Sequence, residues 1–285
     1  MATTEIQIIP SVEALNQTIW QIQQKQSSIG FVPTMGALHE GHLSLVRASR
    51  QKCDVTIVSI FVNPTQFAPH EDLDQYPRPI ENDLQLLAKE GVDWVFVPQP
   101  DQMYPPGCST SINPPDVARR LEGESRPTHF GGVATVVLKL LNMTQCDVAF
   151  FGQKDYQQAL VIQHLVRDLN LPTKIEVCPI VRDHDGLALS SRNVFLTADE
   201  RESALCLSRT LNETAAMIAE GETDGRVIMA HMTQSLIEGG VTETDYAVIA
   251  DAETLELLED VRRPAVLLLA AKVGNTRLID NCVIK

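Results

Sequence analysis

Two imidazoles stand three residues apart, as His39 and His42, in the segment Pro-Thr-Met-Gly-Ala-Leu-His-Glu-Gly-His at residues 33–42. An apolar run precedes this segment and an amphipathic run follows it, so the pattern predicts a strand, a tight turn and a helix. Residues at i and i+3 share one helix face, beside the unpaired N–H groups and the positive dipole end of the first turn. The segment is therefore suited to hold an anion such as a nucleotide phosphate.

Histidines at this spacing also occur as surface or capping residues and as zinc ligands. Zinc requires further ligands, and no other Cys or His stands at a metal-like spacing nearby. Gly36 and Gly41, inside the predicted strand, turn and helix, favour the phosphate-binding interpretation. His-x-Gly-His in this setting is typical of enzymes that transfer a nucleotidyl group from ATP or CTP.

A second polar cluster, Asn63-Pro-Thr-Gln66, follows the next apolar run. Pro64 biases Asn63 toward an extended conformation and helps to fix the loop. The two amides can hydrogen-bond a hydroxyl or a carboxylate without adding charge, which suits a small polar acid. A capped loop without a ligand is the alternative for this segment taken alone.

A third cluster, Gly-Gln-Lys-Asp-Tyr-Gln-Gln at residues 152–158, stands at another predicted strand-to-helix junction. Gly152 permits a close backbone approach, and Lys154 supplies a positive charge that Asp155 can orient. Asp155 can instead accept from a ribose hydroxyl, and Gln158, one turn further on, can face the same cleft as Gln66. A solvated lysine and aspartate at a helix start are the alternative.

Leu-Ser-Ser-Arg-Asn at residues 189–193 offers two hydroxyls and a guanidinium on a predicted hairpin. Arg192 can bind phosphate oxygens bidentately, and a closing loop can stabilise a pyrophosphate leaving group. Taken alone this is an ordinary loop sequence. Together with His-x-Gly-His far upstream, it resembles the second signature of class I nucleotidylyltransferases.

The elements that must position these clusters alternate along the first two thirds of the chain. Continuous apolar strands between helical patterns predict an α/β fold, a Rossmann-like doubly wound parallel sheet covered on both faces. Ligands bind beyond the carboxyl ends of such strands, where the polar clusters follow. The predicted strands are residues 29–33, 55–62, 92–97, 147–151 and 174–178, and the predicted helices are residues 43–53, 80–90, 132–144 and 156–169.

The pattern changes after residue 178, which predicts a smaller α+β C-terminal domain. A hairpin over residues 179–193 turns at Asp185-Gly186, and Thr197 to Glu200 form a capping box. We therefore expect one domain over residues 1–179 and another over residues 180–285. The second should contain helices at 197–219 and 224–238 and strands at 246–250, 265–273 and 277–284.

Composition limits the classes of partner. The net charge of −14 disfavours nucleic acid and anionic membranes, because binding them needs clustered Lys and Arg. Residues 1–9 show no secretory signal, and no apolar run approaches the ~20 residues of a membrane span. Six scattered cysteines without a Cys-x-x-Cys pair predict reduced thiols and a cytoplasmic protein.

With these motifs in place, the sequence closely resembles the pantothenate synthetase family, the AMP-forming pantoate–β-alanine ligases. One departure is Gln153, where the family often carries Glu. The matching motifs are Val-Pro-Thr-Met-Gly-Ala-Leu-His-Glu-Gly-His at 32–42, Ser-Ile-Phe-Val-Asn-Pro-Thr-Gln-Phe at 59–67, Arg-Pro-Thr-His-Phe-Gly-Gly-Val at 126–133, Phe-Phe-Gly-Gln-Lys-Asp-Tyr-Gln-Gln at 150–158 and Val-Arg-Asp-His-Asp-Gly-Leu-Ala-Leu-Ser-Ser-Arg-Asn at 181–193.

The resemblance implies a HIGH-type nucleotidylyltransferase fold and ATP-dependent condensation of (R)-pantoate with β-alanine through an enzyme-bound pantoyl adenylate. Catalysis would rest on His39, His42, Lys154 and Arg192, with His42 as the acid. Pantoate would bind at Gln66 and Gln158, beside Asn63 and His129, and Gln66 would also reach β-alanine. The ATP site would be lined by Met35, Gly36, Ala37, Leu38, His39, Glu40, Gly41, His42, Gly152, Gln153, Lys154, Asp155, Val181, Leu189, Ser190, Ser191 and Arg192.

The resemblance also implies Mg²⁺ with the ATP and a homodimer. The family's proposed magnesium-binding acids fall near Asn82 and Asp83 here, and we assign no metal ligand. Two alternatives remain: a nucleotidylyltransferase that stops after nucleotidyl transfer, and a nucleotide-binding regulator without turnover. A tRNA synthetase is disfavoured by the net charge and by the lack of an evident basic anticodon-binding domain.

Overall fold

The computed structural model describes residues 6–68 and 73–285, which divide into two compact units. The first unit consists of Met1–Gly152 and Gln158–Pro179, and the second of Gln153–Gln157 and Ile180–Lys285. The short Gln153–Gln157 segment thus groups with the C-terminal part of the chain. Residues 1–5, which belong to the N-terminal segment without a signal pattern, lie outside the described residues.

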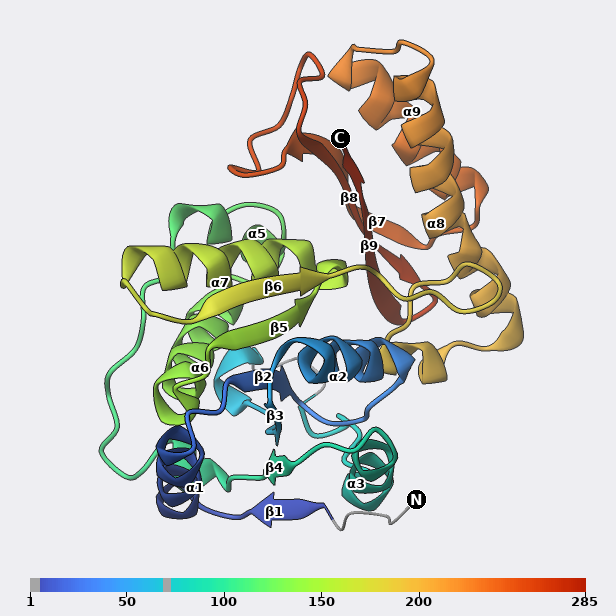
Figure 1. Cartoon of the computed structure of the whole chain (residues 1–285). Helices are drawn as coiled ribbons and strands as arrows, with labels where there is room; N and C mark the ends of the chain where they lie inside the picture. Colours follow the sequence, from blue (N-terminus) through green and yellow to red (C-terminus); the bar gives the residue numbers. More distant parts are fainter. Residues whose placement is uncertain (1–5, 69–72) are drawn as a thin grey trace. The chain divides into compact units, whose positions relative to one another are not determined.

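Six parallel strands form the sheet of the first unit, in the order β1-β4-β3-β2-β5-β6 (Figure 1). β2 and β3 pair in register from Ile29↔Val55 to Thr34↔Ile60, so their carboxyl ends lie at the same edge. The central strands are buried because both faces of the sheet are covered by helices. The strands are β1 (Gln7–Ile9), β2 (Ile29–Thr34), β3 (Val55–Ile60), β4 (Trp94–Phe96), β5 (Val148–Gly152) and β6 (Lys174–Cys178).

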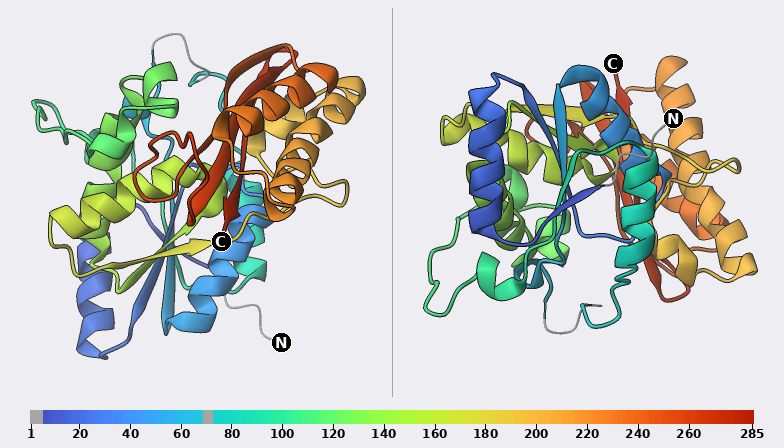
Figure 2. Two further views of the ribbon diagram at one scale, coloured as in Figure 1. Left: turned by 90° about the horizontal axis from the view of Figure 1, so that it is seen from above. Right: turned by 60° about the horizontal axis from the view of Figure 1, so that its bottom comes forward.

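Helices cover both faces of this sheet; α1 and α2, for example, lie on opposite sides of it (Figure 2). Apolar residues at helical spacing on α2 and α3, such as Leu43, Val46 and Leu87, join one core cluster with Val32 and Val58. The helices are α1 (Val12–Gln24), α2 (Glu40–Lys52), α3 (Ile80–Lys89), α4 (Pro100–Met103), α5 (Glu122–Ser125), α6 (His129–Thr144) and α7 (Tyr156–Asp168), with 3-10 turns η1 (Pro64–Gln66) and η2 (Asp116–Ala118).

The strand order reverses direction between β2 and β5. From β2 the chain passes through α2 to its neighbour β3, whereas β5 continues through α7 to β6 on the other side of the sheet. Such a reversal is a topological switch point, and doubly wound sheets bind their ligands at the carboxyl ends of the strands there. The histidine segment follows β2 directly.

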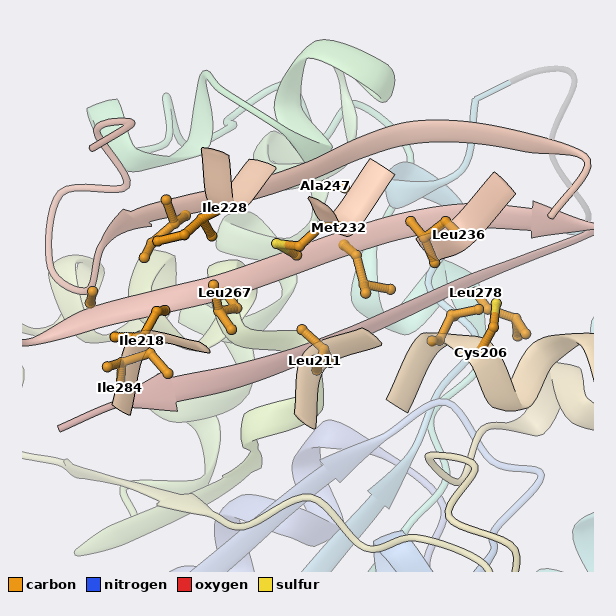
Figure 3. Close-up of a cluster of buried hydrophobic side chains, with 14 of the residues drawn as sticks. Cys206, Leu211, Ile218, Ile228, Met232, Leu236, Ala247, Leu267, Leu278 and Ile284 are labelled. Atoms are coloured by element: carbon orange, nitrogen blue, oxygen red, sulfur yellow. The ribbon is translucent and has the colours of Figure 1, made fainter. Parts of the chain in front are cut away.

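The second unit pairs two helices with an antiparallel sheet of order β7-β8-β9. Cys206 and Leu211 of α8, Met232 of α9 and Leu267 of β8 belong to its buried core, shown in Figure 3. Its elements are η3 (Gln153–Asp155), η4 (Ser191–Phe195), α8 (Ala198–Ala219), α9 (Gly225–Glu238), β7 (Glu243–Asp251), β8 (Ala265–Val273) and β9 (Thr276–Ile284). In the part of the chain that the structure describes, no helix is long and apolar enough to cross a membrane.

The predicted α/β fold and each predicted strand and helix are confirmed, with ends shifted by a few residues. α2 starts at Glu40 and α6 at His129, each three residues before its predicted start, because the first turns, Glu-Gly-His and His-Phe-Gly, interrupt the apolar period with polar residues and glycine. The predicted hairpin is reduced to a bridge between Arg182 and Ala188, followed by η4. β1 and α1 were not predicted.

Candidate active site

The turn after β2 bends sharply and is held by a side chain of another helix. Gly36 and Ala37 both have positive φ, at 85° and 51°. The left-handed conformation costs a non-glycine residue about 1–2 kcal/mol. The N–H groups of Ala37 and Leu38 donate to the two carboxylate oxygens of Asp83 on α3, at 2.9 and 2.8 Å. The turn delivers the chain to His39, the N-cap of α2.

The two histidines cap α2 reciprocally. His39 Nδ1 accepts from the N–H of Gly41 at 3.2 Å, and His42 Nδ1 accepts from the N–H of His39 at 3.3 Å. A ring nitrogen that accepts carries no proton, so each neutral ring has its hydrogen on Nε2. The ring centroids lie 4.1 Å apart. Two neighbouring Nε2–H donors at a helix N-terminus form an arrangement that binds anions.

Glu40, the first residue of α2, turns its side chain toward its own helix. Its carboxylate pairs with Arg47, which also pairs with Glu90 at 2.7 Å. Hydrogen bonding to the Arg47 guanidinium lowers the pKa of Glu40. In residues 35–42, which we call the histidine turn, Glu40 therefore takes part through its backbone. The charge of its side chain is compensated by Arg47.

The cluster after β3 contains two buried amides, Asn63 and Gln66, 1% and 7% exposed. The Tyr104 hydroxyl donates to Asn63 Oδ1 at 2.8 Å, and the Thr65 hydroxyl donates to the same oxygen at 3.0 Å. Asn63 Nδ2 then donates to Gln66 Oε1 at 3.0 Å. These donors fix the orientation of both amides, so Gln66 has its Nε2 hydrogens available as donors. Its Nε2 donates to Met35 Sδ, in the turn after β2, at 3.2 Å.

The backbone of Gln66 is held from α6. His129 Nδ1 donates to the Gln66 carbonyl at 3.0 Å, while Arg126 lies 3.3 Å from the other ring nitrogen of His129. A Cβ placed on Gly132 would lie 2.4 Å from the Thr65 carbonyl oxygen, so only glycine lets α6 approach this closely. His129 is thus seen to position Gln66, and its contact with a substrate stays a prediction.

In the second unit, Asn281 of β9 holds the Lys154 segment. Its side-chain Nδ2 donates to the carbonyls of Gln153 and Lys154, at 2.9 and 3.0 Å, and its Oδ1 accepts from Gln153 Nε2 at 3.1 Å. This pattern requires an amide at position 153, because a carboxylate has no hydrogen to donate. Lys154 Nζ lies 3.9 Å from Asp155 Oδ1, a distance that brings charge compensation without a hydrogen bond.

Asp280, the neighbour of Asn281 on β9, holds the predicted hairpin. The buried Asp280 carboxylate accepts two bonds from the Arg182 guanidinium, at 2.6 and 2.9 Å, and Arg182 also donates to the Gly186 carbonyl. The N–H of Leu189 donates to the Val181 carbonyl at 3.0 Å, which joins two predicted nucleotide-site residues.

The Ser-Ser-Arg-Asn segment forms the start of η4. Ser190 Oγ caps this turn by accepting from the N–H of Arg192 at 3.3 Å, and Asn193 Nδ2 donates to the Ala188 carbonyl. Both η3 and η4 pack against β9. The structure therefore brings the segments of Lys154 and Arg192 to one strand.

The predicted site residues are thus divided between the units. His39 and His42 contact each other, and Met35 contacts Gln66. Whether Lys154 and Arg192 meet these histidines around one triphosphate stays a prediction. The first unit holds Met35, Gly36, Ala37, Leu38, His39, Glu40, Gly41, His42, Asn63, Gln66, His129, Gly152 and Gln158, and the second holds Gln153, Lys154, Asp155, Val181, Leu189, Ser190, Ser191 and Arg192.

Four supporting residues were not found from the sequence: Tyr104, Arg126, Asp280 and Asn281. Arg126 stands in a quoted family motif and was therefore within reach. Tyr104, Asp280 and Asn281 contact partners far away along the chain, where periodicity gives no signal.

A parallel sheet with a histidine-bearing helix start at its switch point defines an α/β protein that binds a phosphate-bearing ligand. The family model described as pantoate-beta-alanine ligase matches residues 7–283. The pantothenate synthetase of Rhodopirellula baltica is 52% identical over 274 residues, covering 95% of this chain and 96% of its own. That of Moorella thermoacetica is 50% identical over 280 residues, covering 98% and 99%.

Solved structures are similar over the same length. Pantothenate synthetase from Thermus thermophilus has a TM-score of 0.93 at 39% identity, covering 98% of this chain and 99% of its own. Pantoate-beta-alanine ligase from Francisella tularensis, complexed with beta-gamma ATP and beta-alanine, has a TM-score of 0.82 at 38% identity, covering 98% and 97%. The chain therefore belongs to the pantoate-beta-alanine ligase family, and it is an enzyme of the ligase class.

Proposed function

We propose that this enzyme joins pantoate to β-alanine in two steps. A pantoate carboxylate oxygen attacks the α-phosphorus of ATP, the bond from that phosphorus to the bridging oxygen breaks, and pyrophosphate leaves. The β-alanine amine then attacks the acyl carbon of the bound pantoyl adenylate, the carbon–oxygen bond to AMP breaks, and the nitrogen loses a proton. The products are pantothenate, AMP and pyrophosphate.

The observation that carries this proposal is the pair of Nε2–H donors at the α2 N-terminus, beside the fixed donor of Gln66. Anionic phosphates suit the histidines, and the hydroxyl or carboxylate oxygens of pantoate suit the Gln66 amide. Asn63, His129 and Gln158 complete the proposed pantoate site, and Gln66 is also within the proposed reach of β-alanine. No side-chain nucleophile is needed, because positioning and charge stabilisation carry most of the catalysis.

We assign the neutralisation of the remaining phosphate charge to residues of the second unit. Lys154 and Arg192 neutralise charge that develops on the phosphates, with Ser190 and Ser191 as hydroxyl donors. In this proposal residues 1–179 bind pantoate and ATP, and residues 180–285 act as a lid. The packing of η3 and η4 on one strand supports a joint movement of both cations.

Mg²⁺ belongs to the proposal as the companion of ATP. Asp83 does not fit a role as its ligand, because both carboxylate oxygens accept backbone N–H groups. Ligand atoms of Asp183, His184 and Asp185 lie within 4.8 Å of one another, but Arg201 pairs with both aspartates at 2.7 Å. We therefore assign no protein ligand to the metal.

The test supplies ATP, Mg²⁺, pantoate and β-alanine together and then omits one substrate at a time. AMP and pantothenate should form only with all of them, whereas pantoate-dependent exchange of labelled pyrophosphate into ATP should survive the omission of β-alanine. Exchange without amide formation in the complete mixture would indicate an enzyme that stops after nucleotidyl transfer. ATP binding with neither reaction would indicate a regulator.

A homodimer and a cytoplasmic location complete the proposal. Sedimentation of the full chain measures the first, and fractionation of cells that express it measures the second. A monomer in sedimentation would remove the homodimer from the proposal.

A further inference from the structure

Asp83 carries an ionisable carboxyl group yet is only 1% exposed, and its partners are backbone groups of the histidine turn. It stands in the first turn of α3, where the helix dipole favours a negative charge. Its Oδ2 accepts from Ala37 and its Oδ1 from Leu38, so one carboxylate holds two consecutive N–H groups. Burial raises the pKa of Asp83, while its bonds from Leu38 and Ala37 lower it.

The segment that Asp83 holds would not keep its shape alone. Gly36 and Ala37 are consecutive residues with positive φ, and Ala37 has a side chain that disfavours this conformation. Strained backbone of this kind persists only where the surroundings over-determine it. The next residue after Leu38 is His39, whose N–H in turn fixes the ring of His42.

We propose that Asp83 is a positioning residue that fixes both catalytic imidazoles through the backbone of residues 37–39, and that it is not a metal ligand. This inference rests on the proposed function, because it assigns the histidines to the ATP phosphates. Asp83 fixes the position of the α2 N-terminus relative to Gln66. It thereby fixes the position of the two Nε2–H donors. Its own side chain touches no substrate.

The test compares Asp83→Asn and Asp83→Ala with the wild type. Asparagine keeps the shape and one acceptor oxygen but turns N–H hydrogens toward a backbone N–H, whereas alanine removes both acceptors. A misplacement of about 1 Å costs up to about 10²-fold. We therefore expect kcat/KM for ATP to fall about 10-fold in Asp83→Asn and about 10²-fold in Asp83→Ala. The KM for pantoate should stay within about twofold, because Asn63 still holds the Gln66 amide oxygen.

Asp147→Asn is the matched control. Asp147 Oδ2 accepts from the N–H of Ile29 at 2.7 Å, which is the same kind of bond at the opposite end of β2. Its loss should lower the unfolding temperature and leave kcat/KM for ATP unchanged. Equal falls in kcat/KM for Asp147→Asn and Asp83→Asn would show a general effect of stability and would overturn the proposal.

A series of Mg²⁺ concentrations separates positioning from metal binding. The Mg²⁺ dependence of Asp83→Asn should match that of the wild type. Recovery of activity at high Mg²⁺ would make Asp83 a metal ligand and overturn the proposal.

Nitrogen chemical shifts of ¹⁵N-labelled histidine give a readout that needs no activity. In Asp83→Asn the signals of His39 and His42 should lose the pattern of an unprotonated Nδ1 and a protonated Nε2, while the other histidines keep theirs. Unchanged signals would overturn the proposal. If the wild type forms no pantothenate, the proposed function fails, whereas this measurement still decides whether Asp83 positions the rings.

Discussion

In the first unit, hydrogen bonds hold the side chains of the candidate site as well as its backbone. Both imidazoles bond backbone N–H groups through Nδ1, and Gln66 bonds Asn63 through its amide oxygen. In the second unit, the bonds described above for Lys154 and Arg192 end on their backbone atoms. Asn281 holds the Lys154 carbonyl, and Ser190 caps the N–H of Arg192.

This difference separates two kinds of contribution to catalysis. Fixed donors are already in place when a ligand arrives, so their conformational entropy is lost during folding. Long charged side chains on a fixed backbone have several rotatable bonds and can follow charge that moves from substrate to leaving group. We therefore expect the first unit to set substrate recognition and the second to contribute mainly to turnover.

The largest expected effect comes from removing the proposed catalytic groups. His42→Ala, Lys154→Ala and Arg192→Ala should each lower kcat at least ~10²–10³-fold, because each removes a donor aimed at developing charge. Steady-state assays of AMP release measure this, with circular dichroism to show that the variants fold. Near-wild-type rates in two of the three would reject the site.

The second-largest effect should come from weakening the ion pair between Asp280 of β9 and Arg182, which lowers the free energy of unfolding. Asp280→Asn removes one acceptor from the Arg182 pair and leaves a half-buried guanidinium under-compensated, at an expected cost of about 1–3 kcal/mol in unfolding free energy. Urea denaturation measures it. The exposed Lys272–Glu243 pair, 2.6 Å apart, supplies the control, since Lys272→Ala should cost less than about 1 kcal/mol. Equal costs would contradict an anchoring role for Asp280.

Tyr104→Phe should sharpen the contrast between recognition and turnover. It removes the donor to Asn63 Oδ1 while keeping the ring, so the amide chain to Gln66 loses one of the bonds that orient it. One neutral hydrogen bond is worth about 0.5–1.5 kcal/mol, which corresponds to a rise in the pantoate KM of about 2–13-fold. The KM for ATP, measured in the same assays, should not change. A larger effect on ATP would contradict the proposed role of Gln66.

The smallest expected effect is that of Gln153→Glu, which introduces the residue that the family resemblance leads one to expect at this position. Glutamate cannot donate to Asn281 Oδ1, so the variant should lose about 1 kcal/mol of unfolding free energy. Urea denaturation at neutral pH measures the loss. A more stable variant would show that the amide pair does not explain the glutamine.

The sequence was sufficient to predict the order of most strands and helices, because buried parallel strands and amphipathic helices have distinct periods. It also placed the polar clusters directly after strands, where parallel topology gathers them. α1 was missed although Ser11 caps it and Leu15, Ile19 and Ile22 stand at helical spacing. β1, with three residues, is too short to show a period.

The supporting contacts were beyond prediction for a different reason. Asp83 was considered only as an acid near a metal, since nothing local shows that α3 would face the histidine turn. Tyr104 and Asn281 likewise act on partners distant in sequence, and hydrogen bonds of this kind depend on which side chains the tertiary fold places together. Local motifs are enough to propose reactive residues, whereas the residues that orient them require coordinates.

The missing side chain at Gly132 has a consequence for which acids the enzyme can accept. Alanine there would force the Thr65 carbonyl outward, and Gln66, the following residue, would move with it. In the proposed pantoate site, the room left for the acid would then change through the backbone of the turn. Under the proposed role of Gln66, selectivity between acids of different size would be decided behind this amide, by how closely α6 packs against the three-residue turn η1.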